Sequence, residues 1–153
     1  NTIRNYGVIN HSSQQTGIVL GGNTTGDIYD NNISNGTGPA ISVFGYGQIK
    51  VYNNTVENTG KDGTLNGQES IFANDLITGP QSNPKQQMII TNNIIRNPQL
   101  KGGIRVGAYE NNSLASTIQN NTLYILGAPL NWLIFYVVSN APGSIISVNN
   151  VIR

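Results

Sequence analysis

The sequence predicts an all-β chain wound as a parallel solenoid, and three observations predict this fold class. A motif of two adjacent asparagines between apolar residues recurs along the chain. A second short apolar segment lies between consecutive copies of the motif. Asparagine, glycine and β-branched residues dominate these segments, and all of them are mediocre or poor helix formers. We therefore expect residues 1–153 to form a single β domain.

The asparagine motif sets the period of the chain. The segment "VYNNTVENTG" from Val51 to Gly60 contains it in full, and "IYDNN", "IITNN", "TIQNN" and "ISVNN" repeat its first half. The register asparagines are Asn1, Asn31, Asn54, Asn93 and Asn121, with Asn150 as a looser match that would need a one-residue bulge. Their intervals are 30, 23, 39, 28 and 29 residues. A fixed motif at variable intervals indicates a fixed corner between loops of variable length.

The second set of apolar segments shows how the coils are built. These segments lie at 17–22, 40–45, 70–75, 103–108 and 133–138. Hairpins would need tight turns between strands of matched length, whereas these intervals fit strands that pair with their counterparts one period away. In that arrangement equivalent asparagines stack at about 4.8 Å and can hydrogen-bond along the column. One asparagine of each pair can adopt the left-handed backbone of a sharp corner.

The register also predicts which residues share a row. Two interior rows are expected, one of Ile28, Val51, Ile90 and Ile118, the other of Ile18, Ile41, Ile71 and Ile104. Outward rows are expected for Tyr29, Tyr52, Thr91 and Gln119, for Arg4, Ser34, Glu57, Arg96, Tyr124 and Arg153, and for Val19, Ser42, Phe72, Arg105 and Phe135. In these rows Glu57 lies beside Arg96, and in a neighbouring row Asp27 lies beside Lys50, so that two exposed ion pairs are expected.

Composition and charge exclude several classes of function. The net charge is +1, and the eight basic residues form no cluster, which argues against a nucleic-acid partner. The chain has no cysteine, so disulfides and thiolate chemistry are excluded. The longest apolar run, "WLIFYVV" at 132–138, is far shorter than the roughly 20 residues that span a bilayer.

The repeat "I-x-V-x-N-N-x-V-x-N" of Ile49 to Asn58, with "GI-x-V" following, resembles the parallel β-helix repeat of the pectate lyase-like superfamily. The resemblance covers essentially the whole chain and implies a right-handed parallel β-helix of about five to six coils. Proteins of this fold include polysaccharide lyases, glycoside hydrolases, pectin esterases, mannuronan epimerases, phage tailspikes and many bacterial surface proteins. Fold alone does not choose among these functions.

Catalytic chemistry finds little support among the residues. A glycosidase needs two carboxylates, but no two of the seven acidic residues are adjacent. The Asn-Thr-Asp, Asp-Asp and Gly-His-Gly signatures of the polygalacturonases are absent, and the single histidine, His11, has no acidic neighbour. No metal-ligand spacing or cofactor motif appears. We therefore expect no catalytic residue, no metal site and no cofactor.

Two groups of residues are candidates for binding a sugar. Tyr29 and Tyr52 could stack as a platform for a sugar ring, although stacked aromatics can equally serve to stabilise a sheet face. Lys101, Arg105 and Tyr109 form the second group. A lone outward cation such as Arg105 is more often a solvated side chain than a catalytic base.

Three functions are compatible with these residues. The first is a non-catalytic, carbohydrate-associated or adhesive β-helix segment of a secreted or cell-surface protein, which would be extracellular and have a polysaccharide as its partner. The second is part of the catalytic helix of a polysaccharide lyase or glycoside hydrolase. The third is a structural spacer or stalk. The scattered acids favour the first and lean against an enzyme.

Two further expectations concern the ends of the chain and one strand. Neither end carries a capping segment, so further β-helix coils or another domain are expected at both ends. The segment "NWLIFYVVSN" at 131–140 is apolar on both faces, so that a loop or a partner is expected to cover its outer side.

Overall fold

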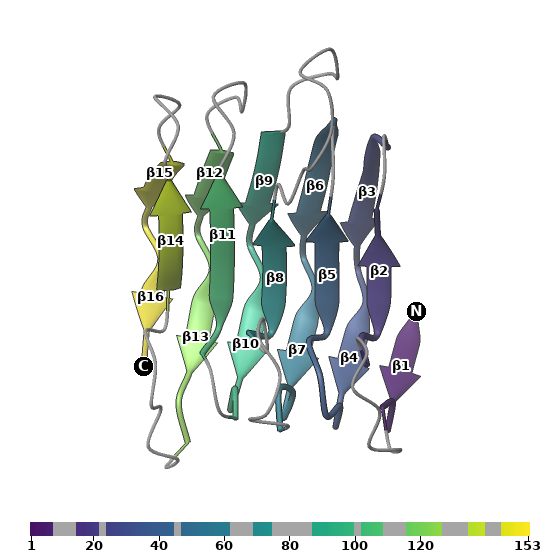
Figure 1. Ribbon diagram of the computed structural model, residues 1–153. Helices are drawn as coiled ribbons and strands as arrows, with labels where there is room; N and C mark the ends of the chain where they lie inside the picture. Colours follow the sequence, from purple (N-terminus) through teal and green to yellow (C-terminus); the bar gives the residue numbers. More distant parts are fainter. Residues whose placement is uncertain are drawn as a thin grey trace.

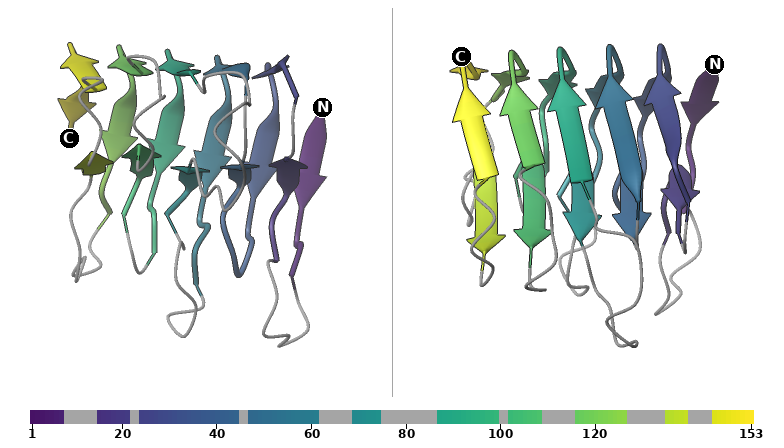
Figure 2. Two further views of the ribbon diagram at one scale, coloured as in Figure 1. Left: turned by 45° about the horizontal axis from the view of Figure 1, so that its top comes forward. Right: turned by 90° about the horizontal axis from the view of Figure 1, so that it is seen from above.

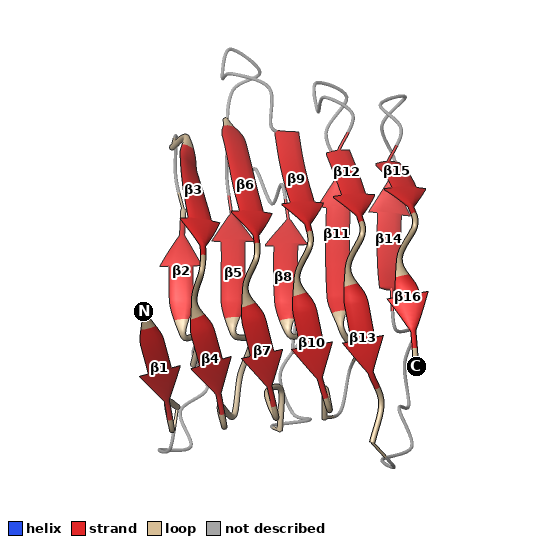
Figure 3. Ribbon diagram, turned by 180° about the vertical axis from the view of Figure 1, so that it is seen from behind, coloured by secondary structure: helices blue, strands red, loops and turns tan. Residues whose placement is uncertain are grey.

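The computed structural model describes residues 1–7, 15–21, 24–44, 47–61, 69–74, 87–99, 102–108, 116–126, 135–139 and 145–153. Every regular element in these ranges is a β-strand (Figure 3). The strands form three parallel sheets that run side by side along the molecule (Figure 1). The all-β solenoid expected from the repeat is therefore confirmed.

The three sheets are numbered here for reference. Sheet 1 contains β1 (Thr2–Arg4), β4 (Asn32–Ser34), β7 (Thr55–Glu57), β10 (Ile94–Arg96), β13 (Thr122–Tyr124) and β16 (Val151–Ile152). Sheet 2 contains β2 (Ile18–Leu20), β5 (Ile41–Phe44), β8 (Ile71–Asn74), β11 (Ile104–Ala108) and β14 (Phe135–Ser139). Sheet 3 contains β3 (Gly26–Tyr29), β6 (Gln48–Tyr52), β9 (Gln87–Thr91), β12 (Ser116–Gln119) and β15 (Ile145–Val148).

Each coil passes through sheet 2, then sheet 3, then sheet 1, and each strand pairs with its counterpart in the next coil. The first coil is β2, β3 and β4, and the fifth is β14, β15 and β16. Strand β1 lies one coil ahead of β4, so that sheet 1 begins one strand before the other two (Figure 2, right).

The two residues of each asparagine motif have different tasks at the corner between sheets 3 and 1. The first residue makes the turn, with a left-handed backbone at Asp30 (φ 52°), Asn53 (55°), Asn92 (56°), Asn120 (55°) and Asn149 (52°). Asparagine and aspartate tolerate this conformation better than other residues with a side chain. The second residue stacks. The expected division of the pair is thus confirmed.

The stacked asparagines form a continuous hydrogen-bonded ladder. The Nδ2 atom of each donates to Oδ1 of the next over 2.9 to 3.1 Å, in the order Asn1, Asn31, Asn54, Asn93, Asn121 and Asn150. From Asn31 onward the backbone N–H of each also donates to that Oδ1. The expected bulge at Asn150 is wrong, because Asn150 lies in the ladder and Val151 pairs directly with Thr122. No bulge is needed, because "VNNV" aligns residue by residue with "QNNT" one coil earlier.

A second, partly exposed corner follows sheet 1. Asn5, Asn35, Asn58 and Asn97 also have a left-handed backbone there, with φ between 49° and 59°. The Nδ2 atom of Asn97 donates to Oδ1 of Asn58 over 2.6 Å. The Nδ2 atom of Asn58 donates to Oδ1 of Asn35 over a longer distance of 3.4 Å. This outer ladder is less regular than the buried one.

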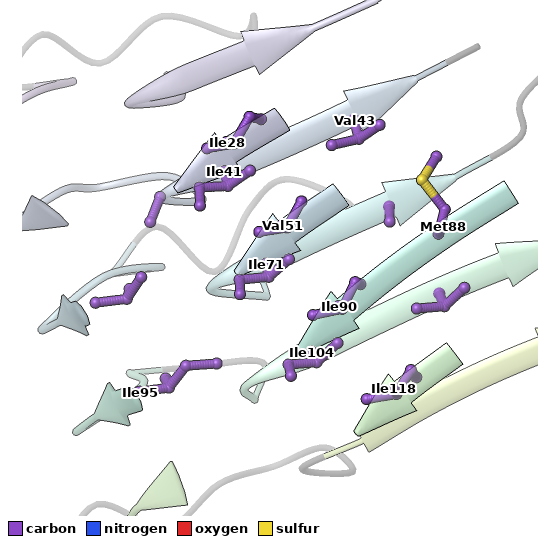
Figure 4. Packing of buried hydrophobic residues seen from close by; sticks show 14 of the residues in the cluster. Ile28, Ile41, Val43, Val51, Ile71, Met88, Ile90, Ile95, Ile104 and Ile118 are labelled. Atoms are coloured by element: carbon purple, nitrogen blue, oxygen red, sulfur yellow. The ribbon is translucent and has the colours of Figure 1, made fainter. Parts of the chain in front are cut away.

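The core consists of stacked aliphatic rows inside the coils (Figure 4). Val51, Ile90 and Ile118 of one expected row are fully buried, and Ile28 at its end is 7% exposed. In the other row Ile41, Ile71 and Ile104 are fully buried, and Ile18 is partly buried. Burial of one such side chain contributes on the order of 2 kcal/mol. Both expected interior rows are therefore confirmed.

The register of sheet 2 differs from expectation at its last strand. Arg105 pairs with Phe72 as expected, but on its other side it pairs with Tyr136 rather than Phe135. Phe135 instead aligns with the inward Ile104. Because the run 132–138 is apolar at successive positions, its alternation could not fix which residues share a row. The expected cover over 131–140 concerns residues and side chains outside the described part of the chain.

Candidate functional site

The outer face of sheet 3 carries a stacked pair of tyrosines at the first and second coils. Tyr29 at the end of β3 pairs in register with Tyr52 at the end of β6. Their ring centroids are 5.0 Å apart and their planes differ by 3°, so the expected stacking is confirmed. Tyr29 is 49% exposed, and Tyr52 is half-buried. The column stops there, because Thr91 follows Tyr52 in the next coil.

Stacking changes which ring surface could meet a ligand. Each tyrosine covers one face of the other, so the pair does not present two broad faces to solvent side by side. Of the two rings, Tyr29 is the more accessible to solvent.

An open groove of about 410 Å³ borders this tyrosine. Its apolar lining comes from Ile18 and Ile28, and Asn1 and Asn31 contribute amide groups. Asp27 and Asp30 also line it, on either side of Tyr29 in the sequence. Ile18 and Ile28 belong to the two interior rows, so this groove opens on the core of the first coil rather than on the outer face of a sheet.

Asp27 is tied to the tyrosine pair by a hydrogen bond. The Tyr52 hydroxyl donates to Asp27 Oδ2 over 3.3 Å. The pKa of Tyr52 is raised by desolvation first, and then by the negative charge of Asp27 and this hydrogen bond, with smaller contributions from Tyr29 and Asp30. The two aspartates thus make the surroundings of the pair electronegative.

The second group of expected binding residues is only partly described. Lys101 and Tyr109 lie outside the described residues. Arg105 lies on β11, where its Nη1 is 3.9 Å from Glu69 Oε1 and its guanidinium lies 5.2 Å from the centroid of the Phe72 ring. Its side chain is only 19% exposed. The interpretation of Arg105 as a solvated outward cation is therefore wrong, because it is paired and stacked on the outer face of sheet 2.

Neither of the two expected exposed ion pairs forms. The register does place Glu57 beside Arg96 and Asp27 beside Lys50. However, Arg105 and Glu69 make the one ion pair found among the described residues. The guanidinium of Arg96 instead lies 5.8 Å from the centroid of the Tyr124 ring in the next coil. The hydroxyl of Tyr52, not Lys50, contacts the carboxylate of Asp27.

The described residues show no arrangement for metal chemistry. In this part of the chain no group of three histidine, cysteine, aspartate or glutamate side chains could hold a metal ion. A helix long and apolar enough to cross a membrane is likewise not found among these residues.

Sequence reasoning missed the groove and its two aspartates. From the sequence, Asp27 is expected to pair with Lys50, and Asp30 has no expected role. The sequence does contain a signal, because the corner residue is aspartate in "YDNN" and asparagine in each of the other four copies. The departure marks the coil that carries Tyr29.

Comparisons with known proteins bear on the fold. The family described as right-handed beta helix region matches residues 1–128, which is most of the chain. This match agrees with the parallel strands and gives the handedness of the coil. Searches of the curated proteins and of the solved structures gave no match.

Proposed function

Since the chain belongs to the right-handed β-helix family, we propose that it is a non-catalytic, carbohydrate-associated segment of a secreted or cell-surface protein. In this proposal a polysaccharide lies on the outside of the coils and docks one sugar ring against Tyr29. The observation that carries the proposal is the stacked pair of Tyr29 and Tyr52 on the outer face of sheet 3, with Tyr29 49% exposed.

The geometry suits a sugar for two physical reasons. A sugar ring presents apolar C–H groups on its face and hydroxyls around its edge, so it needs an aromatic surface with polar groups beside it. Tyr29 supplies the surface, and the exposed Asp27 and Asp30 on the same coil supply hydrogen-bonding groups. Tyr52 holds the Tyr29 ring in place by stacking, which lowers the entropy cost of fixing it on binding.

Binding at such a site is expected to be weak. Tyr29 lies on an exposed sheet face, so that a bound sugar would lose only part of its hydration and bury one face. A polysaccharide can offset this weakness by presenting many equivalent rings. Adhesion or retention on a glycan suits such a site better than capture of a free monosaccharide.

The experiment is a titration of the protein with soluble oligosaccharides, followed by tyrosine fluorescence and by chemical shifts. The panel contains a glucose tetramer, a galacturonic acid tetramer and a glucosamine tetramer. Tyr29→Ala should abolish binding, whereas Tyr124→Ala, which removes a half-buried ring from sheet 1, should leave it unchanged. Ultraviolet absorbance is recorded in parallel to detect unsaturated products.

Three outcomes would overturn the proposal. Absence of binding to the whole panel would favour a structural spacer. Equal loss of binding in the Tyr29 and Tyr124 variants would place the site elsewhere. Release of unsaturated or shortened products would show that the segment is an enzyme.

A further inference from the structure

Several asparagines of this chain carry the acceptor signature of N-linked glycosylation, in which serine or threonine follows two residues later and the residue between is not proline. Seven such sequons occur in the sequence. Three of them lie outside the described residues, at Asn10, Asn23 and Asn111. The other four fall on exposed asparagines, namely Asn32, Asn35, Asn53 and Asn120. None of the seven falls on an asparagine of the buried ladder.

The alternation of sheet 1 explains why the ladder asparagines are not sequons. Two residues after a ladder asparagine comes an inward position, which Val56 and Leu123 occupy fully buried. A hydroxyl there would lie in the apolar core. Two residues after a turning asparagine comes an outward position, which Thr55 and Thr122 occupy half-buried. The asparagine motif therefore accommodates a sequon only on the asparagine that turns the corner.

Asn53 and Asn120 hold equivalent places at the corner between sheets 3 and 1 (Figure 3). Both are exposed, and both have a left-handed backbone with φ of 55°. Their backbone N–H groups donate to the next coil, but within the described part of the chain neither side-chain amide makes a hydrogen bond. The Nδ2 atom of Asn54, in contrast, donates to Asn93 Oδ1 and to two backbone carbonyls. A group attached to Nδ2 would break the ladder at Asn54 but would leave the corner intact at Asn53.

We propose that Asn53 and Asn120 are acceptors of N-linked glycans, transferred from an oligosaccharide carried on a polyprenyl pyrophosphate. A bond forms between Nδ2 and the anomeric carbon of the first sugar, and the bond from that carbon to the pyrophosphate oxygen breaks. The pyrophosphate leaves with the electron pair, and Nδ2 loses one proton. An attached glycan is bulky and hydrated, so the folded chain must leave it in solvent. The exposed corner does so at both positions.

This inference goes beyond the proposed function. The two share a location outside the cytoplasm, where such transfer takes place, but the glycan acceptors do not depend on sugar binding at Tyr29.

The same corner offers a matched control within the chain. Asn92 is also exposed and left-handed, with φ of 56°, but Ile94 stands two residues later, so Asn92 is not a sequon. Ile94 aligns with Thr55 on one side and with Thr122 on the other. Ile94→Thr therefore creates a sequon at Asn92 by installing the residue that both neighbouring coils carry, at little risk to the fold.

The test expresses residues 1–153 in yeast behind a secretion signal and analyses both the medium and the cell lysate. Intact mass before and after enzymatic deglycosylation counts the glycans, and peptide mapping locates them. The wild-type protein is expected to carry glycans at Asn53 and Asn120 and none at Asn92. Thr55→Val, which keeps the shape of the side chain but removes its hydroxyl, should lose only the glycan at Asn53. Ile94→Thr should gain one glycan, at Asn92.

Thermal melting followed by circular dichroism then compares the glycosylated and the deglycosylated protein, which should show the same cooperative transition. Absence of a glycan from both Asn53 and Asn120 would overturn the inference. Retention in the cell of chains glycosylated at these two positions, or loss of the cooperative transition in the glycosylated protein, would also overturn it, because the corner would then not tolerate the glycan. None of these results bears on the titration with tetramers at Tyr29, so the inference and the proposed function can fail separately.

Discussion

The inner and outer faces of sheet 3 follow different rules, although they belong to the same strands. Inward positions hold Ile28, Val51, Ile90 and Ile118, which are nearly identical in character and almost fully buried. One residue further along each strand, the outward positions hold Tyr29, Tyr52, Thr91 and Gln119, which have little in common. Core packing fixes the inner row, whereas the outer row is free to differ from coil to coil. The differences in the outer row are therefore where function should be sought.

The strongest test of this comparison places one charge on either face of β9. Ile90→Asp should prevent folding, because it buries a carboxylate that has no partner in a fully apolar row. Thr91→Asp, one residue away and half-buried on the outer face, should change the free energy of unfolding by only about 0.5 kcal/mol. Circular dichroism with thermal melting measures both variants. A cooperatively folded Ile90→Asp protein would contradict the assignment of the inner row.

The next test compares the buried ladder with the outer one. The side chain of Asn93 makes hydrogen bonds with the backbone of Asn54 and Val51 and with two ladder side chains, and Asn93→Ala leaves these buried groups unpaired. We expect a loss of about 3–5 kcal/mol. Asn58→Gly keeps the left-handed backbone of the outer corner and should cost less than about 1 kcal/mol. Chemical denaturation measures both, and equal losses would show that the two ladders contribute alike.

A smaller effect separates the turning asparagine from the stacking one. Asn92 is exposed with φ of 56°, so Asn92→Val should cost about 1–2 kcal/mol through backbone strain. Asn92→Gly should be close to neutral, because glycine adopts this conformation freely. The two variants are compared by urea denaturation. A large loss in the glycine variant would mean that the Asn92 side chain, and not its backbone, matters at the corner.

The smallest effect is expected from extending the aromatic column. Thr91 follows Tyr52 in register, so Thr91→Tyr would place a third ring on the outer face of sheet 3. Cross-strand aromatic neighbours stabilise a sheet by about 0.5 kcal/mol. A slight rise in melting temperature, without a change in affinity for the ligand at Tyr29, would agree with a free outer row. A clear destabilisation would show that the outer row is constrained by packing.

The sequence was sufficient for the parts of the molecule that repeat. The buried asparagine ladder, the left-handed corner and the inner rows could be predicted because each coil restates the same pattern, and the stacking of Tyr29 on Tyr52 followed from the same register. Where apolar residues follow one another without alternation, the sequence does not show which of them face the core. The one-residue error at Phe135 came from such a run.

Side-chain partners were harder to predict than rows. Glu57 and Arg96 are neighbours as expected, yet Arg96 turns to the ring of Tyr124 on its other side. A register states which residues are adjacent, but it does not state which of two neighbours a long side chain will contact. Glu69 precedes β8 rather than lying opposite Arg105, so no row relation could have indicated that they pair.

The ladder of stacked asparagines also has a direction, which bears on how such a chain can be recombined. From Asn1 to Asn121 each Nδ2 donates to the side-chain oxygen of the following coil. From Asn54 onward the same Nδ2 also donates to a backbone carbonyl of the preceding coil, so that both directions are fixed. A stretch cut at one asparagine corner and rejoined at another therefore meets a matching donor and acceptor, whichever coils are chosen. A graft of half a coil would place a strand opposite a corner and break the column. Duplication and deletion should thus be tolerated in whole periods, which makes the corner a natural junction for lengthening or shortening the solenoid.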